Sequence, residues 1–405
     1  MSEKNPRPSI RVGILSPCPP PYAGITRIVD NHLHFWPRDR VEAYLVPNHP
    51  PANPQPFDGA TYLDLVQASA RSWKGAGAYL NCLLRSPLTR PWVYRQFVLY
   101  NAGLSRLIQQ QGLNVLYAHE LWPAGASAVL QSQIHGIASV VVAYGETWHT
   151  TAQHRRWQRV EPYVLQGSSW IVSTSEHCLA GAIRSGARKD RASVIYAGID
   201  LERFRPDLDG TAFRAEYGIP PDAIVISSLG LALRRKLETF LDALQHLEPG
   251  DNVHCLIGGV GDDSAYVEER ARGIRGVKVQ LLGFVPEKEL PEFYAATDIL
   301  VVSPRTLLEC MGQSMKEAMA CGRAVIGARI GGVPEAIRDD CSGLLFEPDN
   351  PVDLLHALKR LCADRGVRER MGNRGRKIAE EKFSAEVAAR QTLEIFEVLL
   401  RVDPN

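Results

Sequence analysis

Residues 309–322 read ECMGQSMKEAMACG and place two carboxylates, Glu309 and Glu317, eight positions apart with a glycine between them. Just upstream, residues 298–304 (DILVVSP) have the apolar character of a buried strand that ends in a turn. The run rich in Ala and Met after Gly312 favours a helix. Glu309 therefore falls in the loop between strand and helix, and Glu317 lies about one turn inside the helix. Both belong to the carboxyl end of the strand, where open α/β sheets bind ligands.

This loop combines groups that bind hydroxyls with groups that bind anions. Carboxylates accept hydrogen bonds from hydroxyls. The N-terminus of the helix after Gly312 presents free backbone N–H groups to an anion. Hydroxyl-binding groups beside an anion site fit a sugar nucleotide, so the sequence predicts that this loop binds one.

The segment resembles the E-x7-E motif of the GT-B glycosyltransferases of family 4, a family of retaining enzymes. Four other segments resemble family features in the family's order: the domain junction, the loop beside the nucleobase, the Gly-Gly-x-Pro-Glu turn, and the strand after it. They are residues 194–206 (VIYAGIDLERFRP), 282–286 (LGFVP), 331–337 (GGVPEAI) and 343–348 (GLLFEP). Together they cover most of the C-terminal half of the chain.

Apolar strands alternate with helical segments in two blocks, which predicts an α/β fold with parallel sheets covered on both faces. The alternation pauses at residues 200–218, which are charged and contain a proline. The resemblance implies the GT-B arrangement of two doubly wound, Rossmann-like domains facing across a cleft. We predict an acceptor-side domain in 1–205, a nucleotide-sugar domain in 206–378, and a C-terminal helix in 379–405 that crosses back to the first domain.

The family's site residues can be carried onto this chain one by one. The resemblance implies that Glu309 and the backbone N–H groups around Met311 and Gly312 bind the transferred sugar. Glu317 would bind the ribose hydroxyls, and Val285 lies in the loop beside the base. Where the family commonly has Gly-Phe after the first glutamate, this chain has Cys-Met, which leaves the donor sugar undefined.

A leaving diphosphate needs a cation, and a lysine or arginine at a strand end supplies one. Residues 229–236 (LGLALRRK) follow a predicted strand. Lys236 matches the family's lysine, whereas Leu231 stands where the family has an arginine. Arg235 beside Lys236 resembles a family variant with Arg-Lys together, and we expect both to bind the diphosphate. The alternative for Arg234 and Arg235 is an exposed, charged helix start.

The N-terminal half offers further candidates. Gly24 matches the second of two family glycines, where the backbone approaches the diphosphate or the acceptor, although a plain turn also explains it. The family usually has a histidine near the donor sugar where this chain has Tyr144. His149 or His119 would then supply an imidazole, unless these histidines are structural. Glu146 is an open candidate for acceptor contact.

Composition excludes several classes of function. A net charge of +1 argues against a nucleic-acid-binding protein. The absence of any run of about 18 apolar residues argues against a spanning helix. The polar N-terminus does not read as a signal peptide, and eight cysteines without CxxC pairs are typical of a cytosolic protein. No metal-ligand spacing occurs, so we predict a metal-independent reaction.

Residues 65–119 contain no Asp or Glu, and segment 71–106 interleaves arginines with aromatic residues. This composition suits an anionic membrane surface or a lipid acceptor bearing phosphate. Ordinary helix packing with solvated arginines is the alternative. We therefore expect a cytoplasmic protein with peripheral contact at the inner face of the membrane through residues 71–106.

Together these features predict a retaining hexosyltransferase that uses a UDP-, GDP- or other nucleotide diphosphate sugar and needs no cofactor. The expected acceptor is a hydroxyl in cell-envelope or extracellular polysaccharide or glycolipid synthesis. One alternative is a small acceptor such as an aminocyclitol or a secondary metabolite. Another is a catalytically degenerate GT-B scaffold, supported by Leu231 and Tyr144. The retained Glu309, Glu317 and Lys236 argue against the scaffold.

Overall fold

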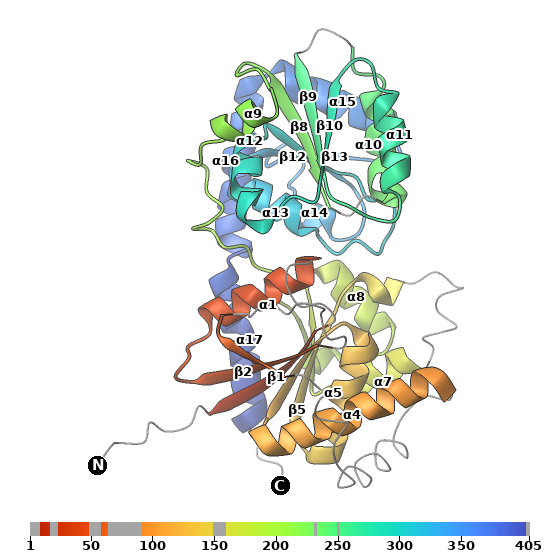
Figure 1. The fold of residues 1–405 in the computed structure, drawn as a ribbon, viewed down its shortest axis with the longest axis vertical. Helices are drawn as coiled ribbons and strands as arrows, with labels where there is room; N and C mark the ends of the chain where they lie inside the picture. Colours follow the sequence, from red (N-terminus) through yellow and green to blue (C-terminus); the bar gives the residue numbers. More distant parts are fainter. Residues whose placement is uncertain are drawn as a thin grey trace. The chain divides into compact units, whose positions relative to one another are not determined.

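The chain forms two compact units, each built on one parallel sheet (Figure 1). The first unit contains residues 1–198 and 385–405, and the second contains residues 199–384. The computed structural model describes residues 9–16, 23–47, 58–63, 91–148, 159–230, 233–248 and 252–401.

Seven parallel strands form the sheet of the first unit in its described residues, in the order β3-β2-β1-β4-β5-β6-β7. The strand order reverses between β1 and β4, so the carboxyl ends of these two strands form the switch point of the sheet. The strands are β1 (Ile10–Ser16), β2 (Val41–Pro47), β3 (Ala60–Tyr62), β4 (Val115–His119), β5 (Ala138–Ala143), β6 (Trp170–Ser173) and β7 (Ala192–Val194).

Helices cover both faces of this sheet, because successive strand residues point to opposite sides and both sets are apolar. One core lies between the sheet and α4, α5 and α7, and the other lies between the sheet and α1 and α17. The helices are α1 (Ala23–Phe35), α4 (Pro91–Gln111), α5 (Ala126–His135), α7 (Val160–Gly167), α8 (Glu176–Arg184) and α17 (Ala385–Arg401).

Six parallel strands form the sheet of the second unit in its described residues, in the order β10-β9-β8-β11-β12-β13. Here the order reverses between β8 and β11, which places a second switch point at their carboxyl ends. The strands are β8 (Ile224–Leu229), β9 (Val253–Gly258), β10 (Lys278–Gly283), β11 (Ile299–Val302), β12 (Ala324–Ala328) and β13 (Leu344–Phe346).

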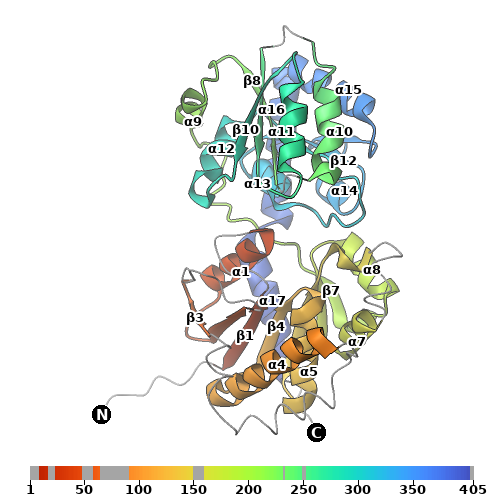
Figure 2. The ribbon, with the colours of Figure 1, turned by 45° about the vertical axis from the view of Figure 1, so that its right-hand side comes forward.

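An apolar core of the second unit lies between its sheet and helices that include α10 and α15, and α12 and α13 contribute further fully buried residues, among them Phe293 and Met315. Figure 2 shows α10 and α11 side by side on one face of this sheet. The helices are α9 (Thr211–Glu216), α10 (Arg234–Leu244), α11 (Ser264–Arg272), α12 (Leu290–Ala296), α13 (Gln313–Ala320), α14 (Val333–Ala336), α15 (Pro351–Ala363) and α16 (Arg365–Lys382).

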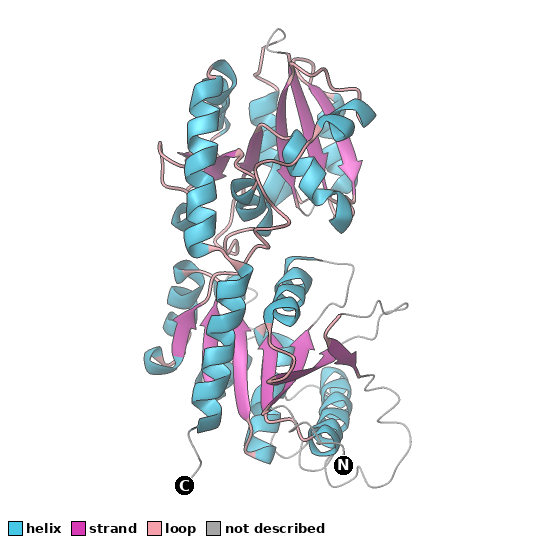
Figure 3. Ribbon diagram, turned by 90° about the vertical axis from the view of Figure 1, so that its left-hand side faces the viewer, coloured by secondary structure: helices cyan, strands magenta, loops and turns pink. Residues whose placement is uncertain are grey.

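The last helix of the chain belongs to the first unit. In Figure 3, α17 lies against the sheet of this unit, and it also packs against α1. The indole Nε1 of Trp36 donates a hydrogen bond to the carbonyl of Ala389 at 3.0 Å. The rings of Trp36 and Phe396 meet with centroids 5.6 Å apart, and Phe396 is fully buried. The C-terminal helix is therefore a structural part of the first unit's core.

The predicted fold class is confirmed: both units are α/β with a doubly wound parallel sheet. The boundaries differ from those read from the sequence. The units divide at Gly198, before residue 205, because Ile199 N–H donates to the carbonyl of Phe383 and Phe204 is buried in the second unit. Helix α16 also continues past residue 379 to Lys382, so the returning helix begins later, at Ala385.

Candidate functional site

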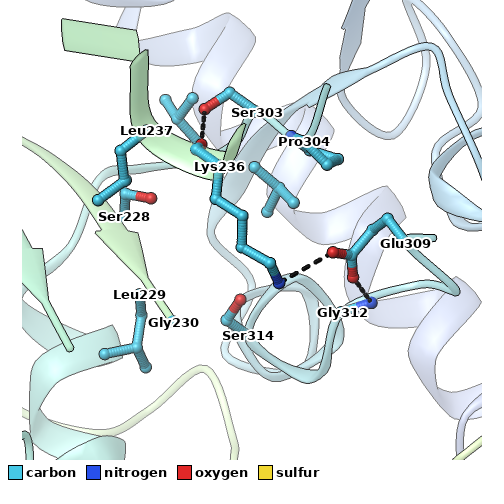
Figure 4. Close-up of a pocket in the computed structure, with 12 residues that line it drawn as sticks. Ser228, Leu229, Gly230, Lys236, Leu237, Ser303, Pro304, Glu309, Gly312 and Ser314 are labelled. Carbon is cyan, nitrogen blue, oxygen red and sulfur yellow. Dashed lines mark hydrogen bonds and ion pairs between the residues drawn. The ribbon is translucent and has the colours of Figure 1, made fainter. Parts of the chain in front are cut away.

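A pocket lies at the switch point of the second unit, where β8 and β11 end (Figure 4). This is the edge at which open α/β sheets bind ligands. It is lined by Ser228, Leu229, Gly230, Lys236, Leu237, Val301, Val302, Ser303, Pro304, Glu309, Gly312 and Ser314. The three serines were not singled out from the sequence, although Ser228 and Ser303 lie at the carboxyl ends of buried strands.

Lys236 and Glu309 form an ion pair inside this pocket. Lys236 lies in the first turn of α10, and its Nζ is 2.9 Å from Oε2 of Glu309 (Figure 4). The other carboxylate oxygen of Glu309 accepts the backbone N–H of Gly312 at 3.0 Å. Burial raises the pKa of Glu309, but the charges of Lys236 and Arg235 outweigh burial and hold this pKa below its usual value. The pocket therefore holds an ionised carboxylate beside a cation.

A Gly-Gly turn fixes the backbone of Glu309. Gly331 adopts φ +60°, and an added Cβ there would overlap the carbonyl oxygen of Glu309. Gly332 N–H donates to the same oxygen at 3.1 Å. The turn preceding α14 therefore seats the loop that carries Glu309, which gives the resembling GGVPE segment a physical role.

Val285 lies next to the pocket, in the loop after β10. A Cβ placed on Gly258 would lie 2.6 Å from Leu229 Cδ1 and 2.9 Å from Val285 Cγ2, so the three residues are in contact. Leu229 lines the pocket, and Val285 is buried beside it. The structure thus places Val285 at the edge of the pocket, while its contact with the base stays a prediction.

Glu317 and Met311 do not line the described pocket, although both are buried. Glu317 is only 1% exposed, and its Oε2 accepts the hydroxyl hydrogen of Tyr294 at 2.6 Å. Gly312 adopts φ +44° immediately before α13 and directs the chain into that helix. The structure therefore brings together Lys236, Glu309 and Gly312, and the ribose contact of Glu317 stays a prediction.

The two arginines before Lys236 have different surroundings. Arg234 donates to Glu238 at 2.9 Å and lies 4.3 Å above the ring of Tyr266, as expected for an exposed helix start. The charge of Arg235 helps to lower the pKa of Glu309, but Arg235 does not line the described pocket. Its role at the diphosphate stays a prediction, whereas Arg234 is engaged elsewhere.

Some sequence candidates lie outside the described residues, among them Leu231, His149 and segment 71–90. Gly24 lies in the first turn of α1, which follows β1.

The segment from residue 91 forms α4, where Phe97 is buried and Tyr100 donates to the carbonyl of Val46 at 3.4 Å. In the described part of the chain, no helix is both long and apolar enough to cross a bilayer.

His119 and Tyr144 form a hydrogen-bonded pair at the ends of β4 and β5. Nδ1 of His119 is 2.8 Å from the Tyr144 hydroxyl. Burial lowers the pKa of His119 to about 3, so the imidazole is neutral. Its Nε2 is buried and has no partner among the described residues. A buried acceptor nitrogen without a hydrogen-bond partner costs less free energy than a buried N–H without one. We therefore assign the proton of His119 to Nδ1, which donates to the Tyr144 hydroxyl, and leave Nε2 as the acceptor.

Glu146 ties the ends of β4 and β5 together. Its two oxygens accept the backbone N–H groups of Leu121 at 3.1 Å and of Tyr144 at 2.8 Å. Burial raises the pKa of Glu146 to about 7. Because both oxygens are bound to the backbone, Glu146 is a structural carboxylate in this arrangement, and the acceptor contact considered for it gains no support.

Two family models match the chain, and together they match most of it. The model for Glycosyl transferases group 1 matches residues 209–378, and the model for Glycosyltransferase Family 4 matches residues 22–203. A D-inositol 3-phosphate glycosyltransferase from Streptomyces bingchenggensis is 33% identical over 60% of this chain and 55% of its own length. An alpha-maltose-1-phosphate synthase from Mycolicibacterium smegmatis is 27% identical over 74% of this chain and 82% of its own length.

Solved structures show the same fold at low identity. Anabaena Alr3699/HepE in complex with UDP and glucose has a TM-score of 0.75 at 18% identity, covering 96% of this chain and 100% of the other. Sucrose-phosphate synthase from Thermosynechococcus elongatus has a TM-score of 0.75 at 19% identity, covering 97% and 100%. The chain spans only 55–58% of the length of the first three curated relatives it matches.

Proposed function

Because the chain belongs to the GT-B glycosyltransferases of family 4, we propose that it transfers a hexose from a nucleotide diphosphate sugar to a hydroxyl, with retention of configuration. The observation that carries this proposal is the ion pair of Lys236 and Glu309 at the switch point of the second unit. A cation beside an ionised carboxylate suits a ligand that combines a diphosphate with sugar hydroxyls.

The pocket supports a division of labour between the two charges. When a diphosphate enters, Lys236 binds its oxygens and gives up part of its interaction with Glu309. Glu309 then accepts hydrogen bonds from the hydroxyls of the sugar, while Gly312 N–H keeps the carboxylate in place. Arg235 adds positive charge from the same helix. In this proposal the two cations bind the diphosphate of the donor, and the carboxylate binds its sugar hydroxyls.

In the proposed reaction, the bond between the anomeric carbon and the phosphate oxygen breaks as the bond to the acceptor oxygen forms on the same face. The leaving phosphate oxygen takes the proton of the acceptor hydroxyl, so no protein nucleophile is required. Lys236 stabilises the charge that develops on the diphosphate. We assign the Tyr144 hydroxyl, oriented by His119, to the place of the family's histidine, and His149 remains an alternative.

The substrates follow from chemistry and from the relatives. UDP is our first choice of nucleotide because the Alr3699/HepE structures contain UDP and UDP-glucose. For the acceptor, an envelope saccharide or glycolipid and a small hydroxyl compound are both consistent with the pocket. The names of the relatives, which act on inositol phosphate or make maltose phosphate, favour the small compound. The proposed setting is the cytoplasm, with segment 71–106 at the membrane surface if the acceptor is a lipid.

Thermal unfolding with UDP, GDP, ADP and dTDP and their hexoses tests this function. A ligand present at a hundredfold excess over its Kd adds about 2.7 kcal/mol to stability. We expect one nucleotide series to stabilise the wild type and to release nucleotide when an acceptor is added. Failure of all four series to bind would overturn the proposal, and binding without turnover on any acceptor would favour the scaffold alternative.

A further inference from the structure

An arginine outside the pocket contacts both of the elements that carry the charged pair. Lys236 lies in the first turn of α10, and Glu309 lies in the loop between β11 and α13. Arg305 belongs to this loop, four residues before Glu309, and was not singled out from the sequence. Its main chain and its side chain both contact α10. The contacts of Arg305 therefore bear on where Lys236 and Glu309 stand relative to each other.

The main chain of this loop is hydrogen-bonded to two successive carbonyls in the first turn of α10. The N–H of Arg305 donates to the carbonyl of Arg235 at 2.9 Å. The Ser303 hydroxyl donates to the carbonyl of Lys236 at 2.6 Å (Figure 4). A carbonyl oxygen has two lone pairs, so it can accept such a bond in addition to a helical one. The loop and the start of the helix are therefore held together along the backbone.

The guanidinium of Arg305 bridges two carboxylates from different elements. One is Glu238 of α10, and the other is Asp349, in the loop before α15, at 2.8 Å. The side chains of Arg305 and Glu238 are 29% and 19% exposed, whereas that of Asp349 is 60% exposed. Water and salt screen a partly buried pair less than an exposed one. The ion pair with α10 is therefore the stronger of the two.

Glu238 is itself held by two neighbours, which makes it a fixed anchor. Its Oε1 accepts hydrogen bonds from Arg234 at 2.9 Å and from the Tyr266 hydroxyl of α11 at 2.8 Å, while Arg305 pairs with Oε2. The hydrogen bonds from Arg234 and Tyr266 lower the pKa of Glu238 to about 2, so this carboxylate is ionised. Arg234 belongs to the same helix as Glu238. Of these two arginines, Arg305 is the one that connects α10 to the loop of Glu309.

We propose that Arg305 is a positioning residue for glycosyl transfer: its ion pair with Glu238 holds the first turn of α10 against the loop that carries Glu309. This link sets the separation of Lys236 from Glu309. The proposal rests on the proposed function, in which these two groups bind the diphosphate and the sugar of one donor. The stem of Lys236 is flexible, so its own ion pair leaves the two elements free to shift. A donor that must meet both charges at once gains from a fixed separation.

Two variants break this link from opposite sides: Arg305→Ala in the loop and Glu238→Gln in the helix. A misplacement of roughly 1 Å can cost about 10²-fold in rate. We therefore expect kcat/KM for the preferred donor to fall about tenfold to a hundredfold in both variants. The double variant should be no worse than either single one, because each removes the same interaction. Arg305→Lys should recover part of the loss, since an ammonium can still pair with one carboxylate.

Two matched controls remove ion pairs that do not join α10 to the loop. Arg234→Ala takes the other arginine from Glu238 and leaves Arg305 in place. Asp349→Asn removes the exposed partner of Arg305, while the pair with Glu238 remains. Both controls should keep kcat/KM near the wild-type value at a similar cost in thermal stability. A loss confined to Arg305→Ala and Glu238→Gln would then reflect position and not a general weakening of the fold.

Hydrogen exchange without any ligand tests the link separately from the reaction. In Arg305→Ala and Glu238→Gln, the amides of residues 303–309 and 234–240 should exchange faster than in the wild type. In Arg234→Ala, residues 303–309 should exchange as they do in the wild type. Unchanged exchange of residues 303–309 in both Arg305→Ala and Glu238→Gln would overturn the link.

The outcomes separate this proposal from the proposed function. If the wild type transfers no sugar, the proposed function fails, and hydrogen exchange still decides whether Arg305 holds the loop to α10. If the wild type transfers sugar and Arg305→Ala keeps its kcat/KM, the proposed function stands and the positioning role is overturned. A loss of kcat/KM that Arg234→Ala shares in full would also overturn it.

Discussion

At the scale of single residues, the second unit prepares its pocket with opposite charges that neutralise each other until a ligand arrives. Lys236 has only Glu309 as an ion-pair partner among the described residues. Its backbone carbonyl accepts the hydroxyl hydrogen of Ser303 at 2.6 Å, which fixes the start of α10. The side chain is therefore anchored at its base and can exchange its charged partner at its tip.

Lys236→Ala should reduce turnover by about 10²–10³, because one electrostatic stabiliser of the developing charge is lost. Arg234→Ala is the matched control, since Arg234 is engaged by Glu238 and Tyr266 and should leave turnover nearly unchanged. Steady-state kinetics with the preferred donor measures both variants. Near-normal turnover in Lys236→Ala would show that another cation, with Arg235 the first candidate, holds the diphosphate.

Glu120 should make the stability of the first unit depend on pH. Burial and the charge of Glu146 raise the pKa of Glu120 in the folded state to about 8, above its usual value of about 4.5. The folded state therefore holds a proton that the unfolded state has released. Stability is fully present below about pH 4.5 and is lost as pH rises through about 8. Glu120→Gln should remove this loss, which thermal unfolding between pH 5 and pH 9 would measure as a flatter profile. Glu394→Gln, a change at an exposed residue of α17, is the control and should keep the wild-type slope. The same slope in Glu120→Gln would contradict the prediction.

Sequence reasoning located the residues whose signals are local. Glu309 and Lys236 follow buried strands at a switch point, and the structure brings them together. The burial of Glu317 against Tyr294 was not foreseeable, because it depends on how α12 and α13 pack. Glu120 directly follows β4, but its positive φ is a property of the folded backbone and could not be read from the sequence.

At the scale of secondary structure, long apolar strands were recognised and less regular ones were not. Strands such as β5 and β11 appear as nearly unbroken apolar runs because both of their faces are buried. Strand β2 contains a glutamate and ends in proline, and β3 is three residues long, so neither stood out. The returning helix was predicted to begin at residue 379, earlier than α17 begins, because the polar side chains at the end of α16 gave no signal that this helix stops.

The turn before α14 provides a prediction at this scale. Gly331→Ala should displace the loop that carries Glu309, since the added methyl group would overlap the Glu309 carbonyl. We expect lower donor affinity and a loss of stability. Gly218→Ala is the control, because Gly218 has the same φ of +60° with nothing within 4 Å. Its cost should be only the backbone strain, about 1–2 kcal/mol. Equal donor affinity in the two variants would show that the turn does not position Glu309.

At the scale of the whole molecule, the chain folds as two units whose boundaries do not follow its order in sequence. The first unit is completed by residues from the end of the chain. The pocket that contains Lys236 and Glu309, in contrast, is built entirely from residues of the second unit. Mutations in α17 should therefore lower the stability of the first unit without changing how the second unit binds the donor.

Phe396→Ala should destabilise the first unit by about 3–5 kcal/mol, as expected for removal of a fully buried aromatic side chain. Val398→Ala is the control in the same helix, since Val398 is 51% exposed. Hydrogen exchange resolved by unit, together with nucleotide binding, measures the result. We expect faster exchange in α1 and α17 with unchanged nucleotide affinity. A matching rise in exchange throughout residues 199–384 would show that the units do not unfold separately.

The capture of α17 by the first unit also sets an order of events on the ribosome. At about 5–20 residues per second, roughly 10 to 40 s separate the emergence of Gly198 from that of α17. Throughout that interval, the sheet face that receives Phe396 has no α17 to cover it. The nascent N-terminal unit therefore keeps this apolar surface uncovered until residues 199–384 have been translated and α17 has followed them.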